Sequence, residues 1–145
     1  MKKISPRYAS ALLTAALFSI SALQAETIDI YPAEKDMTRE IQAAIHLSRE
    51  KKHASVTIQL RQGDYHISRS HASHQLYYIS NTTSSSENPH PVKHIGLWFK
   101  GLRNVIIDGG GARLITHGEM TTFVIDSCEN IVLRNFTLVA ADPTV

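Results

Sequence analysis

The sequence predicts an all-β fold, a parallel β-helix (solenoid), and three observations support this prediction. Residues 97–109 and 123–135 repeat one another at a constant offset of 26 residues. Apolar side chains in these segments recur at every second position, which is the period of a strand. An amphipathic helix precedes the strands, and an open solenoid needs such an element to cover its first turn. We therefore expect about three coils with an N-terminal capping α-helix.

Residues 1–25 have the layout of a secretory signal peptide. A short cationic start precedes an apolar stretch that is too short, and too rich in Ser and Thr, for a membrane span. Its removal leaves residues 26–145 as one domain, secreted or periplasmic and without a membrane span. That part carries 12 Lys and Arg against 13 Asp and Glu, so no basic surface for nucleic acid is expected. An uncleaved anchor is the alternative.

Residues 36–52 are expected to form the helix. One apolar stripe follows the helical spacing, and Asp36 can cap the first turn. The stripe consists of Met37, Ile41, Ala44, Ile45 and Ser48. Its role as a lid on the first coil differs little from that of an ordinary packed helix.

The period then changes from helical to alternating. In SVTIQL, Val56, Ile58 and Leu60 alternate with polar residues and predict a strand, and Gly63–Asp64 predicts a turn. Residues 68–94 are polar, and only Leu76–Ile79 has strand character. The Ser-, Thr-, Asn- and Pro-rich residues 80–91 predict a long surface loop.

The 26-residue repeat makes specific predictions about which side chains stack. Leu97 should lie over Phe123, and Phe99 over Ile125; further along, Val105 and Ile107 should lie over Ile131 and Leu133. Asn104 and Asn130 should form an amide ladder at a corner, a structural role. The equivalence of Leu102 with Cys128 favours a small buried thiol, and a lone cysteine cannot form an internal disulfide.

Two sets of strings resemble known families. TREIQAAI followed by SVTIQLRQGDYHI resembles the opening segment of pectin-lyase-like right-handed β-helix proteins. YYISNTT, the run at 99–104, VIIDGGGA, HGEMTTFVID, CENIVLRNFTL and ADPT, in this order, resemble glycoside hydrolase family 110. This resemblance covers most of residues 26–145. It implies a right-handed parallel β-helix that removes terminal α-1,3-linked galactose from oligosaccharides or glycoconjugates with inversion.

The chain departs from this family in its length. Family members are several times longer, and their catalytic carboxylates lie on later coils. We therefore interpret the chain as an N-terminal fragment whose catalytic residues are expected beyond Val145. A fragment that stops at an open coil is expected to be inactive and poorly soluble.

An inverting glycosidase needs two carboxyl groups, one protonated and one ionised. The candidates in this chain are Asp108, Glu119, Asp126 and Asp142. Turn formation explains Asp108 and Asp142, and alignment with Lys100 suggests a corner role for Asp126. Glu119 follows His117–Gly118 in a loop and could face a cleft. The residues alone do not identify a catalytic pair.

Trp98 and Glu119 are the candidate substrate-binding residues. Strand alternation places Trp98 on the outer face, where it either stacks on a sugar or is covered by a loop, with 80–91 the leading candidate for that loop. Tyr77 and Tyr78 are weaker candidates. His71 and His74 are spaced for a metal only if they lie on a helix, so no metal site and no cofactor is expected.

Two other readings of the function stay open. One is a polysaccharide lyase or pectinase-like hydrolase of the same fold, and lyases of this kind commonly use Ca²⁺. The other is a non-catalytic β-helix adhesin or sugar-binding module, which predicts many more near-identical coils and no carboxylate cleft.

Overall fold

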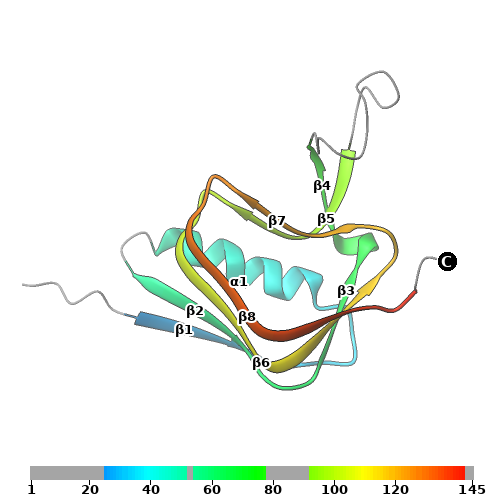
Figure 1. The fold of residues 1–145 in the computed structure, drawn as a ribbon, viewed down its shortest axis with the longest axis horizontal. Coiled ribbons are helices and arrows are strands. Elements are labelled where there is room, and N and C mark those ends of the chain that lie inside the picture. Colours follow the sequence, from blue (N-terminus) through cyan, green and yellow to red (C-terminus); the bar gives the residue numbers. More distant parts are fainter. Residues whose placement is uncertain (1–24, 52–53, 78–91, 143–145) are drawn as a thin grey trace, which may run out of the picture.

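The computed structural model describes residues 25–51, 54–77 and 92–142 (Figure 1). The expected signal peptide and the expected loop at 80–91 lie outside these residues, apart from Ala25. The described elements are β1 (Ala25–Ile30), α1 (Thr38–Glu50), β2 (Ser55–Leu60), β3 (Asp64–Ser68), the 3₁₀ helix η1 (Arg69–His71), β4 (Ser73–Leu76), β5 (Val92–Lys100), β6 (Arg103–His117), β7 (Thr121–Asp126) and β8 (Glu129–Ala140).

The strands form two sheets in which most pairs are parallel. The larger sheet has the order β1–β2–β6–β3, with β8 also paired to β6, and the smaller sheet has the order β4–β5–β7. Only β4 and β5 pair antiparallel. Helix α1 contacts both sheets and lies across the space between them (Figure 1). The expected all-β composition with one helix is confirmed, and no helix among the described residues is long and apolar enough to cross a bilayer.

The predicted stacking register is confirmed at each position where the structure pairs the two repeats. Leu97 pairs with Phe123 and Phe99 with Ile125 in the smaller sheet. In the larger sheet Val105 and Ile107 pair with Ile131 and Leu133. Equivalent side chains therefore lie over one another at the 26-residue offset along β5 with β7 and along β6 with β8 as far as Asp108. Between Asp108 and Ala112 the register shifts, so that from Ala112 onward β6 pairs with β8 at an offset of 24.

The corners between the strands repeat as well. Gly101 and Ser127, at equivalent positions, both have positive φ angles, 62° and 53°, and Asn104 and Asn130 each have φ of 55°. The Asn130 amide donates a 2.9 Å hydrogen bond to Asn104 Oδ1, so the predicted ladder is present. Asn tolerates this left-handed conformation better than most residues, and its amide also links the two turns.

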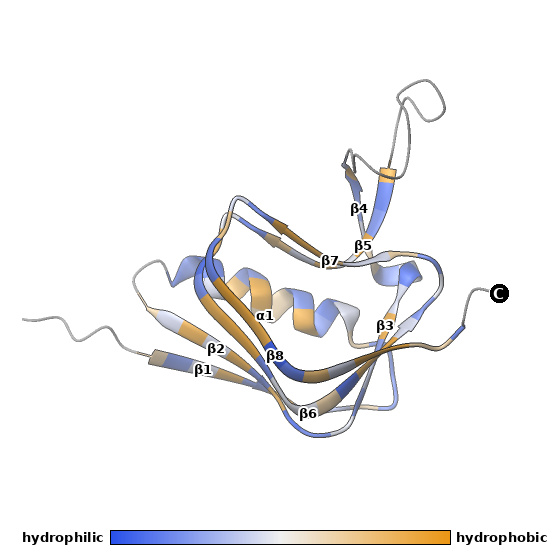
Figure 2. Cartoon of the chain, viewed as in Figure 1, coloured by the Kyte–Doolittle hydropathy of each residue, from blue (hydrophilic) through white to orange (hydrophobic). Residues whose placement is uncertain are grey.

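The core lies between α1 and the inward faces of both sheets. The predicted helical stripe is buried along its whole length, and Val56, Ile58 and Leu60 are fully buried as the alternation predicts. The Gln42 amide fixes α1 to β5, because it donates to the Trp98 carbonyl (2.9 Å) and accepts from the Trp98 N–H (2.8 Å). Figure 2 shows apolar residues along β6, β7 and β8.

Three local expectations need correction. The helix begins at Thr38 rather than Asp36, although Asp36 Oδ1 accepts from the Thr38 N–H (2.8 Å). Of the strand expected at Leu76–Ile79, only Leu76 and Tyr77 are among the described residues; Leu76 is the last residue of β4, which pairs with β5 from Ser73 onward, and Tyr77 is not in a strand. The Cys128 thiol is only partly buried, because β7 and β8 have no further strand stacked on them among the described residues.

Candidate functional site

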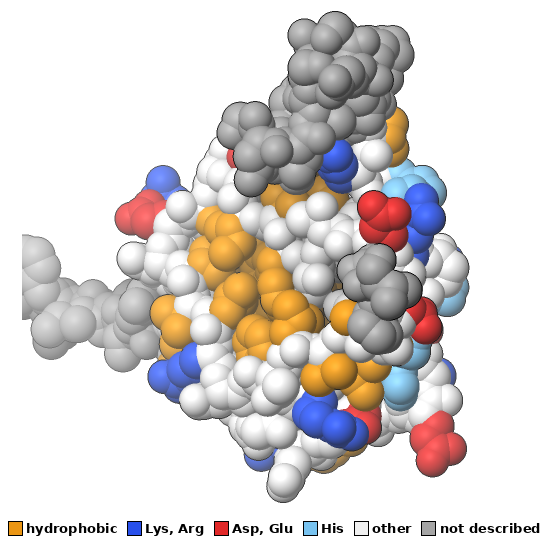
Figure 3. Space-filling view, turned by 45° about the vertical axis from the view of Figure 1, so that its right-hand side comes forward, with side chains coloured by type: hydrophobic (Ala, Val, Ile, Leu, Met, Phe, Trp, Pro, Cys, Tyr) orange, Lys and Arg blue, Asp and Glu red, His pale blue; other side chains and the backbone are white. Residues whose placement is uncertain are grey.

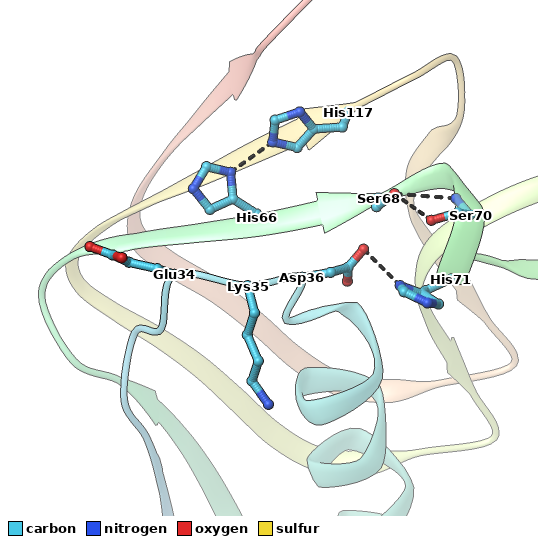
Figure 4. A pocket seen from close by; sticks show the side chains of 8 residues that line it. All are labelled: Glu34, Lys35, Asp36, His66, Ser68, Ser70, His71 and His117. Carbon is cyan, nitrogen blue, oxygen red and sulfur yellow. Dashed lines mark hydrogen bonds and ion pairs between the residues drawn. The ribbon is translucent and has the colours of Figure 1, made fainter.

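The described residues form an open pocket where the loop before α1, β3, η1 and the end of β6 meet. Its volume is about 460 Å³, which lies within the range of small-molecule sites. Polar and charged residues line it, although their carbon atoms make up much of its surface, and Figure 4 shows their side chains. They are Glu34, Lys35, Asp36, His66, Ser68, Ser70, His71 and His117. We call this feature the histidine pocket.

Two histidines from neighbouring parallel strands form one wall of the histidine pocket. His66 lies on β3 and His117 is the last residue of β6, which pairs with Ser68. His66 Nδ1 and His117 Nε2 are 2.7 Å apart, and the ring centroids are 5.0 Å apart. One nitrogen must donate and the other accept, so this bond requires at least one neutral imidazole.

A carboxylate and a third histidine lie on the other side of the pocket in Figure 4. Asp36 Oδ2 is buried and lies 2.9 Å from His71 Nδ1, although the contact is poorly aligned for a hydrogen bond. Burial alone would raise the pKa of Asp36. Hydrogen bonding to Thr38 and the contact with His71 outweigh burial, so the pKa is lowered overall. The histidine pocket therefore carries an ionised carboxylate at neutral pH.

A second polar cluster surrounds Trp98 on the outer face of β5 and β7. The Trp98 indole N–H donates to Tyr77 Oη (2.9 Å), which in turn donates to Asp126 Oδ2 (2.6 Å). Lys100 Nζ lies 3.4 Å from Asp126 and 5.4 Å from the centroid of the Trp98 ring. The expected outward position of Trp98 is confirmed. Its neighbours Leu97 and Phe99 are buried, and Trp98 itself is half-buried. The other candidate tyrosine, Tyr78, and the proposed covering loop lie outside the described residues.

The four carboxylates singled out in the sequence are dispersed over separate corners and loops. Asp108 lies at a corner, where Arg134, Asn135 and the Gly110 N–H donate to it. Asp126 aligns with Lys100 at another corner, as the sequence predicted. Glu119 and Asp142 are exposed in loops and lie outside the lining of the histidine pocket.

The environments of the two corner carboxylates, Asp108 and Asp126, favour their ionised forms. Hydrogen bonds from the Asn135 amide, the Gly110 N–H and Arg134 lower the pKa of Asp108. Tyr77, Ser127 and Lys100 lower the pKa of Asp126 in the same way. Every carboxyl group with a shifted pKa among the described residues is shifted downward. These groups are Asp36, Glu40, Asp64, Asp108 and Asp126. A glycosidase acid needs the opposite shift.

The two histidines considered for metal binding are separated. His71 contacts Asp36, whereas His74 packs edge-on against His94 with ring centroids 4.2 Å apart. Within residues 25–51, 54–77 and 92–142, no group of three or more His, Cys, Asp or Glu side chains is placed to hold a metal ion.

The pairing of His66 with His117 was missed by local motif reading, because 51 residues separate the two. A signal for it exists in the sequence. Residues 55–68 align with residues 104–117 at a constant offset of 49, as the pairs Val56–Val105 and Asp64–Arg113 show. This offset places Ser68 beside His117, and His66 two residues away.

Comparison with known proteins gives one consistent group of relatives. The chain is 42% identical over 121 residues to a protein named alpha-1,3-galactosidase A from Bacteroides thetaiotaomicron, a match that covers 83% of this chain and 21% of that protein. It is 33% identical over 122 residues to alpha-1,3-galactosidase B from Parabacteroides distasonis, covering 83% and 18%. It is 36% identical over 96 residues to alpha-1,3-galactosidase A from Bacteroides fragilis, covering 66% and 16%.

No protein-family model matches the sequence. The chain spans about a fifth of the length of the relatives it matches.

Proposed function

Because the chain is a homologue of the proteins named alpha-1,3-galactosidase, we propose that it is part of a glycoside hydrolase that removes terminal α-1,3-linked galactose from glycans. The single observation that carries this proposal is the 42% identity over 121 residues, a match that covers 83% of this chain. The same names favour a galactosidase over the lyase and adhesin alternatives.

We propose further that the strands are the first coils of a right-handed parallel β-helix. The parallel stacking of β7 on β5 and of the first half of β8 on β6 at a 26-residue offset supports this proposal, and the second half of β8 continues the stack at an offset of 24. The asparagine ladder between the two turns supports it as well. A solenoid of this kind buries its core by adding turns, each of which contacts only its neighbours.

The end of the stack at β7 and β8 supports a longer parent protein. Ile125 and Leu138 are 51% and 48% exposed, while their partners Phe99 and Leu114 are fully buried. Figure 3 shows hydrophobic side chains gathered on one face of the molecule. We propose that a further coil of the parent covers these side chains and pairs with the free edges of β7 and β8.

The catalytic step is proposed to use two carboxyl groups in an inverting mechanism. The general acid must hold its proton near neutral pH, which requires a raised pKa. Because the chain spans about a fifth of the length of its relatives, we assign the acid to residues outside the described part of the protein. The 145-residue chain by itself is then proposed to be inactive. We also propose that residues 1–25 direct export.

A chimera tests the proposed function. Residues 26–142 replace the matching segment of the B. thetaiotaomicron relative, and release of galactose from an α-1,3-linked galactobiose is measured. The chimera should fold and release galactose, whereas the isolated 145-residue chain should not. A folded chimera without activity would contradict the proposal, and so would turnover by the isolated chain.

A further inference from the structure

The histidine pocket has hydrogen-bonding groups that take no partner from the described residues. The bond between His66 Nδ1 and His117 Nε2 uses one nitrogen of each ring and leaves His66 Nε2 and His117 Nδ1 for other partners. Each imidazole can donate or accept according to its tautomer. The Ser68 and Ser70 hydroxyls, 2.7 Å apart, add groups with the same versatility. A ligand of this pocket must therefore offer several donors and acceptors close together.

The groups around the pocket disfavour three classes of ligand. The ionised Asp36 carboxylate and the exposed Glu34 disfavour an anion. Lys35 does not offset them, because its ammonium group is paired with Glu40. A metal ion would need a third converging ligand, which the described residues do not provide. An apolar ligand would remove water from the imidazoles and hydroxyls without replacing their hydrogen bonds.

A neutral polyhydroxylated ligand fits the remaining chemistry. Sugar hydroxyls both donate and accept, so they match the imidazoles of His66 and His117 and the hydroxyl of Ser70, each of which can do either. The volume of about 460 Å³ accommodates a hexose ring. We propose that the histidine pocket is a saccharide-binding site that holds one hexose unit of the glycan. The choice of galactose as that unit rests on the proposed function.

Binding of a simple galactoside tests this assignment. Methyl α-D-galactopyranoside is titrated into the ¹⁵N-labelled 145-residue chain, and amide shifts are followed by NMR. We expect shifts centred on β3, η1 and the end of β6, with a dissociation constant on the order of 1 mM. His66→Ala and His117→Ala should each weaken binding about tenfold, as expected when a neutral hydrogen bond is lost.

Two further variants separate binding from folding. His74→Ala removes an exposed histidine outside the histidine pocket and should leave the affinity unchanged. Ser70→Tyr places bulk at the mouth of the pocket from an exposed position, so it should abolish binding while the other amide signals stay in place. Absence of binding at high millimolar sugar, or binding that survives both Ser70→Tyr and His117→Ala, would overturn the assignment.

Together with the chimera experiment, the binding experiment shows whether the pocket assignment or the proposed function has failed. An active chimera together with a pocket that binds no sugar would reject the pocket alone. A pocket that binds the galactoside in a His117-dependent way, together with an inactive folded chimera, would reject the galactosidase proposal and retain the saccharide site. Displacement of the sugar by Zn²⁺ or phosphate at micromolar concentration would also overturn the assignment, because it would mean that the pocket is built for an ion.

Discussion

Equivalent side chains on the two stacked turns differ sharply in exposure. Phe99 and Leu114 on β5 and β6 are fully buried, whereas Ile125 and Leu138, which lie directly over them on β7 and β8, are about half exposed. The two turns share the positive φ angles of one corner, at Gly101 and Ser127 and at Asn104 and Asn130, although the first turn has two extra residues between Asp108 and Ala112. Position in the repeat therefore sets where a side chain points, while burial depends on whether another layer covers it.

Truncation of the two partners in one stacked pair should give the largest contrast. Phe99→Ala should lower the free energy of unfolding by about 3–5 kcal/mol, because it opens a cavity in a fully covered core. Ile125→Ala, on the uncovered turn, should cost about 1 kcal/mol or less. Urea unfolding followed by circular dichroism measures both. Equal losses for the two variants would show that the turns are equally buried in solution.

The second largest effect should come from the contact that joins α1 to the covered turn. Gln42→Met keeps the side-chain volume but removes both hydrogen bonds to the Trp98 backbone. We expect a loss of about 2–3 kcal/mol, because a buried N–H and C=O are left without partners. The exposed His46, which also contacts Gln42, provides the control. If His46→Ala lowers the free energy of unfolding as much as Gln42→Met does, the stabilisation does not come from the two hydrogen bonds between Gln42 and the Trp98 backbone.

Substitutions at Asn130 separate two contributions to stability, the strain of a positive φ angle and the hydrogen bond between the turns. Asn130→Ala keeps the strained φ of 55° but removes the side-chain amide, and with it the hydrogen bond to Asn104. We expect the free energy of unfolding to fall by about 1–2 kcal/mol. Asn130→Gly tolerates the same φ and should cost about half as much, through the lost ladder bond and added chain entropy. Chemical denaturation compares the pair. A glycine variant less stable than the alanine variant would contradict this account of the corner.

Acid should loosen the link between the covered and uncovered turns. Arg134 and Asn135 on β8 donate to Asp108 on β6, and together with the Gly110 N–H they lower the pKa of Asp108 in the folded state. A lowered folded pKa adds stability above the unfolded value of about 4, and this stability is lost as the pH falls through the folded pKa. The urea concentration at the midpoint of unfolding should therefore decrease as the pH is lowered below about 4. The decline should be shallower in Asp108→Asn, and an unchanged slope in that variant would remove Asp108 from the explanation.

The sequence predicted the repeated parts of the fold better than the others. Regular alternation around Phe99 and Ile125 identifies both the strands and their register, because only one offset aligns the apolar faces. The strand at Ser73–Leu76 was not predicted over its first three residues, since these are polar and the strand is held by pairing with β5. Partial exposure of Cys128 could not be predicted from its alignment with Leu102, because alignment carries no information about the layer above.

Prediction of the site was less complete for a physical reason. Trp98 was correctly placed on the outer face, but its hydrogen bond to Tyr77 joins segments 21 residues apart. The contact of Asp36 with His71 and the pair formed by His66 and His117 depend on η1 and on the 49-residue offset between β3 and β6. These contacts follow from tertiary pairing, so a search for local ligand spacing does not find them.

Disulfide trapping across the two turns tests the stacking most directly. Arg103 and Glu129 are exposed partners in the parallel pairing of β6 with β8, so cysteines at both positions should lie within disulfide range. In a Cys128→Ser background, the Arg103→Cys/Glu129→Cys double variant should oxidise rapidly to an intramolecular bond. Arg103→Cys/Thr137→Cys, eight residues out of register, should stay reduced. Preferential oxidation of the second pair would contradict the 26-residue stacking on which the account depends.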